Sequence, residues 1–236
     1  MPSSHHTGNA FIRRAQNRSM ARGECAAYRR HLCETHELLK HDIETRLSSF
    51  RRAWDAGDEE ALGKELLFCI LTPQSTAHGC WDTICELSSS GKLLTGAPED
   101  LAPHLHRARF KNKKAVFLVE ARERFLPGGI KAALSPFACQ QEARAWLADT
   151  VKGMGFKEAS HFLRNIGCGS DLAILDRHIL RSLVRAGTLP EEPVSLSPRR
   201  YLAIEDSMRL LADDLSIPLD HLDFVIWYDA KHEIFK

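Results

Sequence analysis

Net charge is nearly absent from this chain. Its 236 residues carry 32 lysines and arginines against 31 aspartates and glutamates, which leaves a formal charge of +1. A balance this even gives no overall electrostatic attraction to a polyanion, so a nucleic-acid function has to rest on local charge and on motifs. The first thirty residues are the exception: we expect a basic, flexible tail there, with non-specific DNA affinity as the alternative. The arginines of this tail are Arg13, Arg14, Arg18, Arg22, Arg29 and Arg30.

Long apolar runs are missing as well. No stretch is long enough to cross a bilayer, and the N-terminus has no apolar signal-peptide core. The seven cysteines are scattered and no two form a Cys-x-x-Cys pair, which argues against a zinc ribbon or an iron–sulfur loop. We therefore expect a cytoplasmic protein whose thiols stay reduced.

Strand signals are also rare, because alternating β-branched runs and Asn-Gly or Asp-Gly turns are nearly lacking. Apolar residues instead recur at helical spacing between glycines and prolines, which predicts an all-α fold. Asp58 is expected to cap one of the helices. The expected helices cover about 36–54, 58–71, a segment through 81–87, a short one from 98, 112–124, 141–151, 156–166, 176–186, 199–215 and 219–230.

We expect these helices to form two lobes with a cleft between them. One lobe would be continuous, over residues 76–188, and would hold the helical hairpin described next. The other would combine residues 31–75 with residues 189–236. The proline-rich link at 190–198 is the best candidate for a crossing between the lobes.

The most informative segment is residues 151–160, Val-Lys-Gly-Met-Gly-Phe-Lys-Glu-Ala-Ser. Gly153 and Gly155 flank one apolar residue between two helices, where glycine permits a positive φ or a close backbone approach. The N–H groups at the start of the second helix can hold a phosphate. Lys157 falls in the first turn of that helix, where a positive charge is disfavoured, so the position favours the neutral amine that nucleophilic attack requires. A plain helical corner with a solvated lysine is the alternative.

A second informative segment is residues 172–180, Leu-Ala-Ile-Leu-Asp-Arg-His-Ile-Leu. Asp176 follows an apolar run and precedes a helix, so an N-cap is its simplest role. A carboxylate held there can also stabilise positive charge that develops on a sugar. The two roles are compatible.

Together these two segments resemble the helix-hairpin-helix DNA glycosylase superfamily. Within it, the sequence of residues 155–167 and 172–180 is similar to that of the archaeal-type 8-oxoguanine DNA glycosylase/AP lyases, and weaker similarity extends from about residue 36 onward. The resemblance implies base excision repair, in which Lys157 attacks the anomeric carbon and Asp176 stabilises the oxocarbenium-like state. The Schiff base then permits β-elimination of the 3′ phosphate. Because the damaged base must leave the stack, a pocket deep enough for a purine is expected.

The resemblance also implies contacts with DNA. Gly153 and Gly155 would present N–H groups to a phosphate, and His178 would lie near the backbone, with a buried capping histidine as the alternative. Gln74 would face the gap left by the flipped base, or lie in an ordinary interhelical turn. Arg109 and Phe110 resemble the family's wedge, although Phe110 would otherwise be assigned to the core.

The C-terminal segment resembles relatives that end soon after an Asp-x-x-x-Trp stretch, with a terminal lysine beside the lesion pocket. This implies that Asp223 hydrogen-bonds the purine edge and that Trp227 lies in or beside the pocket. Lys236 would contact the oxidised base through its side chain or its terminal carboxylate. For Trp227, an ordinary core position is a strong alternative.

The expected function is excision of 8-oxoguanine from duplex DNA followed by strand cleavage. Two alternatives stay open: a glycosylase of the same fold for another oxidised base, and a helix-hairpin-helix module that binds DNA without chemistry. The expected partner is double-stranded DNA containing 8-oxoguanine or abasic sites, bound by a monomer in the cytoplasm with the chromosome. No membrane partner, metal or organic cofactor is implied, although a monovalent cation at the hairpin carbonyls is compatible with the resemblance.

Overall fold

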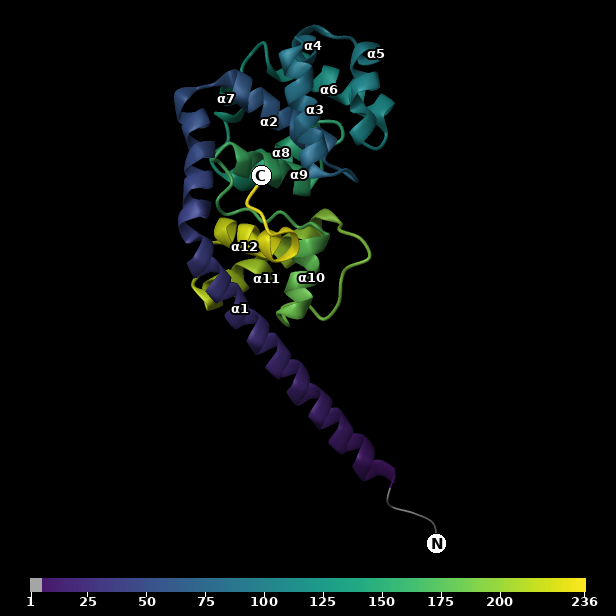
Figure 1. Ribbon diagram of the computed structural model, residues 1–236, viewed down its shortest axis with the longest axis vertical. Helices are drawn as coiled ribbons and strands as arrows, with labels where there is room; N and C mark the ends of the chain where they lie inside the picture. The colour runs from purple at the N-terminus through teal and green to yellow at the C-terminus, as the bar shows by residue number, and fades with distance from the viewer. Residues whose placement is uncertain (1–5) are drawn as a thin grey trace. The chain divides into compact units, whose positions relative to one another are not determined.

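Every regular element that the computed structural model describes, over residues 6–236, is helical (Figure 1). Side chains are described from Arg22 onward. The chain divides into two compact units, each built from two separate segments. Unit 1 comprises the chain up to Lys40 together with Leu175–Glu233, and unit 2 comprises His41–Ile174 together with Ile234–Lys236. None of the described helices is both long enough and apolar enough to cross a membrane.

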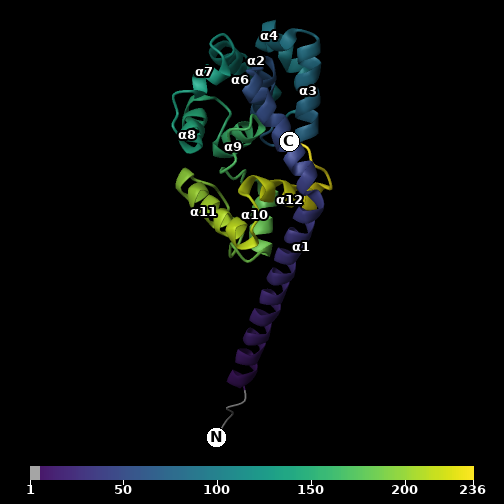
Figure 2. The same cartoon turned by 90° about the vertical axis from the view of Figure 1, so that its left-hand side faces the viewer.

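Unit 2 is built around α2, which begins at the Asp58 cap, where the side chain accepts a hydrogen bond from Ala61 N at 3.0 Å. Buried apolar residues cover all sides of the C-terminal half of α2, from Leu66 to Leu71, because the helix packs against α3, α6, α7 and α9 (Figure 2). The helices of this unit, besides the C-terminal part of α1 (His6–Ala56), are α2 (Glu59–Leu71), α3 (Ala77–Ser89), α4 (Lys92–Thr95), α5 (Pro98–Leu101), the 3₁₀ helix η1 (Ala102–Arg107), α6 (Lys111–Phe125), α7 (Ile130–Leu134), α8 (Gln140–Thr150) and α9 (Phe156–Asn165).

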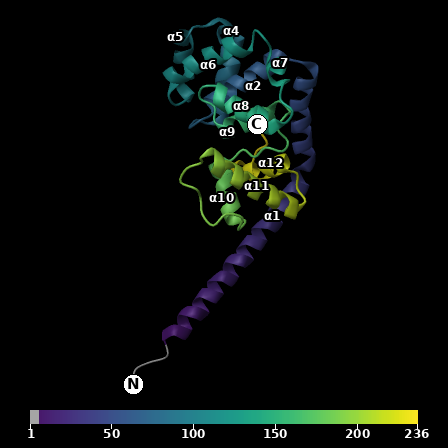
Figure 3. The same ribbon diagram turned by 180° about the vertical axis from the view of Figure 1, so that it is seen from behind.

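Unit 1 joins the preceding part of α1 to α10 (Arg177–Arg185), α11 (Pro198–Leu215) and α12 (Leu219–Lys231), which Figure 3 shows from behind. Buried polar bonds connect these helices. The Tyr28 hydroxyl lies 2.9 Å from Ser182 Oγ and donates to Asp229 Oδ2 at 3.0 Å. Burial, the largest cause, raises the pKa of Tyr28 to about 12, so this hydroxyl stays protonated at neutral pH.

The expected basic tail is helical from His6 as part of α1, and its end is anchored in unit 1, because Tyr28 and Leu32 are buried. Residues 1–5, and the side chains of Arg13, Arg14 and Arg18, lie outside the part of the chain that the structure describes.

The expected lobe boundaries differ from the observed units. Residues 59–71 belong to unit 2 because α2 forms its centre, and residues 177–185 belong to unit 1 because α10 packs against α12. The proline-rich link at 190–198 lies wholly inside unit 1, so the prediction of a crossing there is wrong. Proline marks the end of a helix, but it does not show which core the next helix joins.

Candidate active site

The hairpin between α8 and α9 requires glycine at its tip. Gly153 has φ of +84°, and a Cβ added there would lie 2.6 Å from Phe117 Cδ2. Both the left-handed backbone and the close aromatic ring exclude larger residues. Met154, which is 5% exposed, points into the core and anchors the turn, while the two glycines remain exposed. The hairpin therefore presents its backbone at the surface.

Lys157 lies in the first turn of α9, as predicted, with a side chain that is 26% exposed. Its Nζ is 3.1 Å from Oε1 of Glu158. The other carboxylate oxygen, Oε2, accepts a hydrogen bond from Gly155 N at 3.1 Å. Glu158 thus contacts both the expected nucleophile and one of the expected phosphate donors. Sequence reasoning missed this residue, although a glutamate three positions after a helix cap is the signal for such a bond.

The charge of Lys157 affects the pKa of several buried groups in unit 2. Burial lowers the pKa of Lys114 and places the pKa of His161 well below its usual range, and in both cases the Lys157 charge acts in the same direction. Burial raises the pKa of the Cys80 thiol to about 11, against the smaller effects of the two lysines. Besides the Glu158 carboxylate, the groups that respond to Lys157 are therefore, at neutral pH, a neutral thiol and a neutral imidazole, together with the Lys114 side chain.

Gln74 and Phe110 share an unusual backbone conformation, with φ of 56° and 59°. Both side chains are exposed, and the 61% exposure of Phe110 rules out the core position that was its alternative. The Arg109 guanidinium carbon lies 5.6 Å from the centre of the Phe110 ring. Non-glycine residues rarely adopt this conformation unless their surroundings enforce it, so these two positions are specified by the fold.

Hydrogen bonds of Ser75 and Lys114 hold the backbone of these two turns in place. Ser75 Oγ accepts hydrogen bonds from Arg109 N and from Lys114 Nζ, both at 3.1 Å. Lys114, which is 5% exposed, also donates to the Leu71 carbonyl at 2.6 Å and to the Pro73 carbonyl at 2.7 Å. The structure thus brings the Gln74 turn and the Arg109–Phe110 turn together, as an interface with DNA would require.

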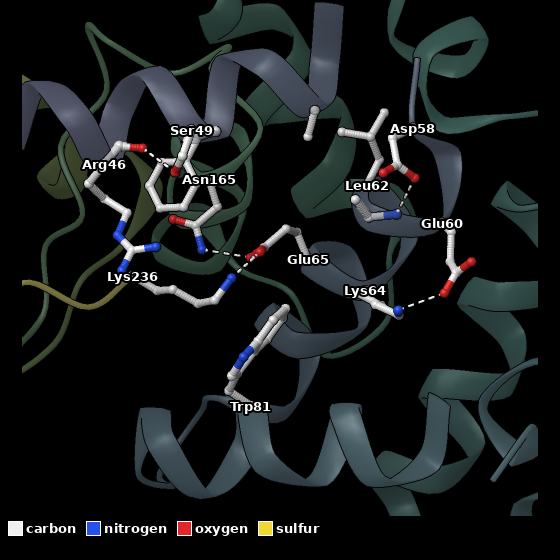
Figure 4. Close-up of a pocket in the computed structure, with 13 residues that line it drawn as sticks. Arg46, Ser49, Asp58, Glu60, Leu62, Lys64, Glu65, Trp81, Asn165 and Lys236 are labelled. Carbon is white, nitrogen blue, oxygen red and sulfur yellow. Dashed lines mark hydrogen bonds and ion pairs between the residues drawn. The ribbon is translucent and has the colours of Figure 1, made fainter. Parts of the chain in front are cut away.

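A cavity of about 410 Å³ lies between α1, α2 and α3 in unit 2 (Figure 4). Of the predicted site residues described, Lys236 alone lines it. The Lys236 ammonium pairs with the Glu65 carboxylate and lies 3.4 Å from the centre of the Trp81 ring. Asn165 Nδ2 donates to the second oxygen of Glu65 at 2.9 Å. The side chain of Lys236 is 8% exposed, and its ammonium is held by Glu65.

The remaining predicted residues belong to unit 1. Asp176 caps α10, where its Oδ1 accepts hydrogen bonds from His178 N at 2.7 Å and Ile179 N at 2.9 Å. The His178 ring meets the Trp227 ring edge to face, with centroids 5.7 Å apart. Burial has the largest effect on the pKa of His178 and lowers it, whereas the nearby Asp176 carboxylate acts to raise it. Asp223 lies one turn before Trp227 on α12 and is 7% exposed.

An all-α chain with a glycine hairpin, a lysine in the following turn and an aspartate capping a later helix defines a helix-hairpin-helix DNA glycosylase. The family model described as 8-oxoguanine DNA glycosylase matches residues 43–217. The chain belongs to this family.

The chain matches curated relatives over most of their length. The 8-oxoguanine DNA glycosylase/AP lyase of Fusobacterium nucleatum is 41% identical over 203 residues, which cover 85% of this chain and 93% of the relative. The protein of the same name from Methanocaldococcus jannaschii is 39% identical over 200 residues, covering 84% of this chain and 93% of the relative.

Solved structures with a similar fold come from 8-oxoguanine glycosylases. The 8-oxoguanine DNA glycosylase of Thermotoga maritima aligns with a TM-score of 0.80 and 34% identity, over 90% of this chain and 100% of that chain. The Methanocaldococcus jannaschii glycosylase/lyase in complex with a 15mer DNA containing 8-oxoguanine aligns with a TM-score of 0.78 and 38% identity, over 87% of this chain and 99% of that chain.

Proposed function

We propose that this protein excises 8-oxoguanine from duplex DNA through a lysine Schiff base and then cleaves the strand at the abasic site. One observation carries the proposal: Lys157 lies directly after the Gly153–Gly155 hairpin, in the first turn of α9, in a member of this family. A module that only binds DNA needs the glycines but has no use for an amine at a helix N-terminus, where its charge is disfavoured. The relatives' shared name, glycosylase/AP lyase, supports the same chemistry.

The proposed reaction begins at the sugar. The neutral amine of Lys157 attacks C1′ as the C1′–N9 bond breaks, and the oxidised base leaves with a proton. The sugar ring opens to give an iminium ion at C1′. Loss of a C2′ proton then breaks the C3′–O bond and releases the 3′ phosphate, which cuts the strand. Asp176, held rigidly as the cap of α10, stabilises positive charge on the sugar while keeping the helix intact.

We assign the proposed DNA contacts to residues that are exposed at the surface. Gln74, Arg109 and Phe110 project from two turns that Ser75 and Lys114 hold together, so they are suited to enter the duplex where a base has been flipped out. Gly153, Gly155 and His178 contact backbone phosphates.

The proposed contacts with the oxidised base come from Asp223, Trp227 and Lys236. The buried indole N–H of Trp227 has no hydrogen-bond partner among the described residues, so it is available as a donor. Lys236 would act through its main chain, because its amine is held by Glu65. We further propose that the protein acts as a monomer on DNA with 8-oxoguanine or abasic sites, in the cytoplasm with the chromosome.

Borohydride trapping tests this function. A duplex with one 8-oxoguanine opposite cytosine is incubated with wild type, Lys157→Gln and the matched control Lys152→Gln. Lys152 is an exposed hairpin lysine, 65% exposed and paired with Glu120. We expect a covalent protein–DNA adduct with wild type and the control, and none with Lys157→Gln. An adduct that persists in Lys157→Gln refutes the assigned nucleophile. If wild type is trapped on an abasic-site duplex but not on the 8-oxoguanine duplex, the protein excises another lesion.

A further inference from the structure

The last three residues, Ile234–Lys236, belong to unit 2, where α3 holds two of their side chains. The Phe235 ring stacks on the His78 ring, with centroids 4.0 Å apart and planes inclined by 29°. Three residues further along α3, the centre of the Trp81 ring lies 3.4 Å from Lys236 Nζ. We call these three residues the terminal tripeptide. It docks on α3 through two neighbouring aromatic contacts.

The Lys236 side chain enters a polar socket that three helices build (Figure 4). We define the lysine socket as Glu65 on α2, Trp81 on α3 and Asn165 at the end of α9. Glu65 pairs with Lys236 through one carboxylate oxygen and accepts a hydrogen bond from Asn165 Nδ2 at 2.9 Å through the other. Asn165 is itself oriented, because its Oδ1 accepts from Arg164 Nε at 3.0 Å. Each member of this polar chain is buried.

An ion pair in this position adds direction more than stability. The desolvation of two buried charges offsets most of their attraction, so a well-packed apolar side chain would anchor the terminal tripeptide as firmly. A carboxylate with a fixed neighbour, however, accepts hydrogen bonds only from defined directions. The Asn165 bond therefore fixes Glu65, and Glu65 fixes the depth and orientation of Lys236.

The main chain of Lys236 is held separately, by the helix that carries Lys157. Burial lowers the pKa of His161, and a hydrogen bond between its ring and the main chain of Lys236 acts in the opposite direction. His161 follows Lys157 by four residues in α9, so the two side chains lie one turn apart on the same face. The main chain of Lys236 is thus held one helical turn from the proposed nucleophile.

We propose that Glu65 is a positioning residue for recognition of the oxidised base, which acts by holding Lys236 in the lysine socket. This inference rests on the proposed function, in which the main chain of Lys236 contacts that base. Glu65 acts only through Lys236 and takes no part in the chemistry at the sugar. Because an abasic site has no base to recognise, the socket serves base excision and is not needed for strand cleavage.

The test compares two substrates, a duplex with 8-oxoguanine opposite cytosine and a duplex with an abasic site. Glu65→Gln keeps the size of the side chain and an acceptor for Asn165 but removes the charge that holds Lys236. Lys236→Met and the double variant complete the cycle. Glu60→Gln is the matched control, because Glu60 lines the same cavity but is 64% exposed and pairs with Lys64 at 2.6 Å. Single-turnover rates are measured at saturating protein.

We expect Glu65→Gln to slow excision of 8-oxoguanine roughly tenfold or more, because Lys236 loses the partner of a buried ion pair and leaves its position. Cleavage of the abasic-site duplex should keep its wild-type rate. The double variant should be no slower than the slower single variant, since both changes remove the same contact. Glu60→Gln should match wild type on both duplexes.

Hydrogen exchange of the amides at 234–236 reports docking of the terminal tripeptide without any lesion. A segment that is held exchanges slowly, and one that opens locally exchanges faster. We expect faster exchange in Glu65→Gln and in Lys236→Met than in wild type and Glu60→Gln.

Four results would overturn the inference. Equal slowing on both duplexes would make Glu65 a structural residue, and unchanged excision would show that the socket does not govern recognition. A double variant slowed by the product of the two single effects would show that Glu65 acts independently of Lys236. Unchanged exchange would show that Glu65 does not hold the terminal tripeptide. Failure of the proposed function appears instead as a wild type that does not excise 8-oxoguanine, and the exchange comparison then still decides whether Glu65 positions Lys236.

Discussion

Replacement of Lys114 by methionine tests how the two DNA-facing turns are held. Methionine fills a similar volume but cannot donate, so the carbonyls of Leu71 and Pro73 and the Ser75 hydroxyl each lose a partner. A buried acceptor left unsatisfied costs about 1–3 kcal/mol, and Leu71 is fully buried. Because burial lowers the pKa of Lys114, part of that cost is offset when its ammonium is no longer desolvated. We expect a net loss of about 3 kcal/mol.

Thermal melting measures this loss. For a chain of this size, 1 kcal/mol corresponds to roughly 2–4 °C, so Lys114→Met should lower Tm by about 6–12 °C. Lys111→Met is the control, because Lys111 is exposed on the same helix and should change stability by less than about 0.5 kcal/mol. A Tm for Lys114→Met within 2 °C of the control would refute the assignment, since it would mean that the three acceptors find other partners at no cost.

The pH dependence of the same variant has a definite sign. The folded pKa of Lys114 lies below its ordinary value of 10.5, so the unfolded chain binds more protons between the two values. Wild-type stability therefore gains from this group as the pH rises through that window. The gap between wild type and Lys114→Met should widen as the pH rises towards 10.5, and a constant gap would contradict the burial that we describe.

Three further outcomes are expected. Gly153→Ala should lose roughly 1–3 kcal/mol in denaturant melts, because its φ is positive and Phe117 leaves no space, whereas Gly128→Ala, in open space, should not. Wild type should lose stability as the pH falls below 6.5, by up to about 1.4 kcal/mol per pH unit, because the folded pKa of His161 is depressed; melts of His161→Phe should lack this slope. Phe110→Ala should melt like wild type but bind lesion duplex roughly tenfold more weakly in a fluorescence titration, and equal affinity would exclude a wedge.

Helices with strong local signals could be predicted from the sequence almost to the residue. The expected helix at 156–166 is α9 at Phe156–Asn165, and the one at 199–215 is α11 at Pro198–Leu215. A glycine or proline at each boundary fixed these limits, and amphipathic spacing fixed the interior. The cap at Asp176 was equally predictable, because an aspartate before an apolar helical repeat satisfies the first free N–H groups.

Elements that depend on distant residues could not be predicted. The helix α7, at Ile130–Leu134, was missed because the Glu59 carboxylate, seventy-one residues away, accepts the N–H of Ile130 at 2.6 Å. The N-terminal extension of α1 was missed because its composition is polar and lacks a repeating apolar face. The candidate site divides in the same way. Lys157 could be found from its motif and Glu158 from the three-residue spacing of a capping box, but the buried amine of Lys236 depends on contacts that spacing alone does not specify.

The division of both units into two segments constrains the order in which the chain can fold during synthesis. Most of unit 2 is one continuous stretch, His41–Ile174, so its core can form as soon as that stretch has left the ribosome. Unit 1 cannot, because Tyr28 and Leu32 pack in a unit whose other segment runs to Glu233. At the usual rate of about 5–20 residues per second, these side chains wait roughly 10–40 seconds for their partners. Until then Tyr28 and Leu32 stay exposed on the nascent α1, where a chaperone would protect them from aggregation.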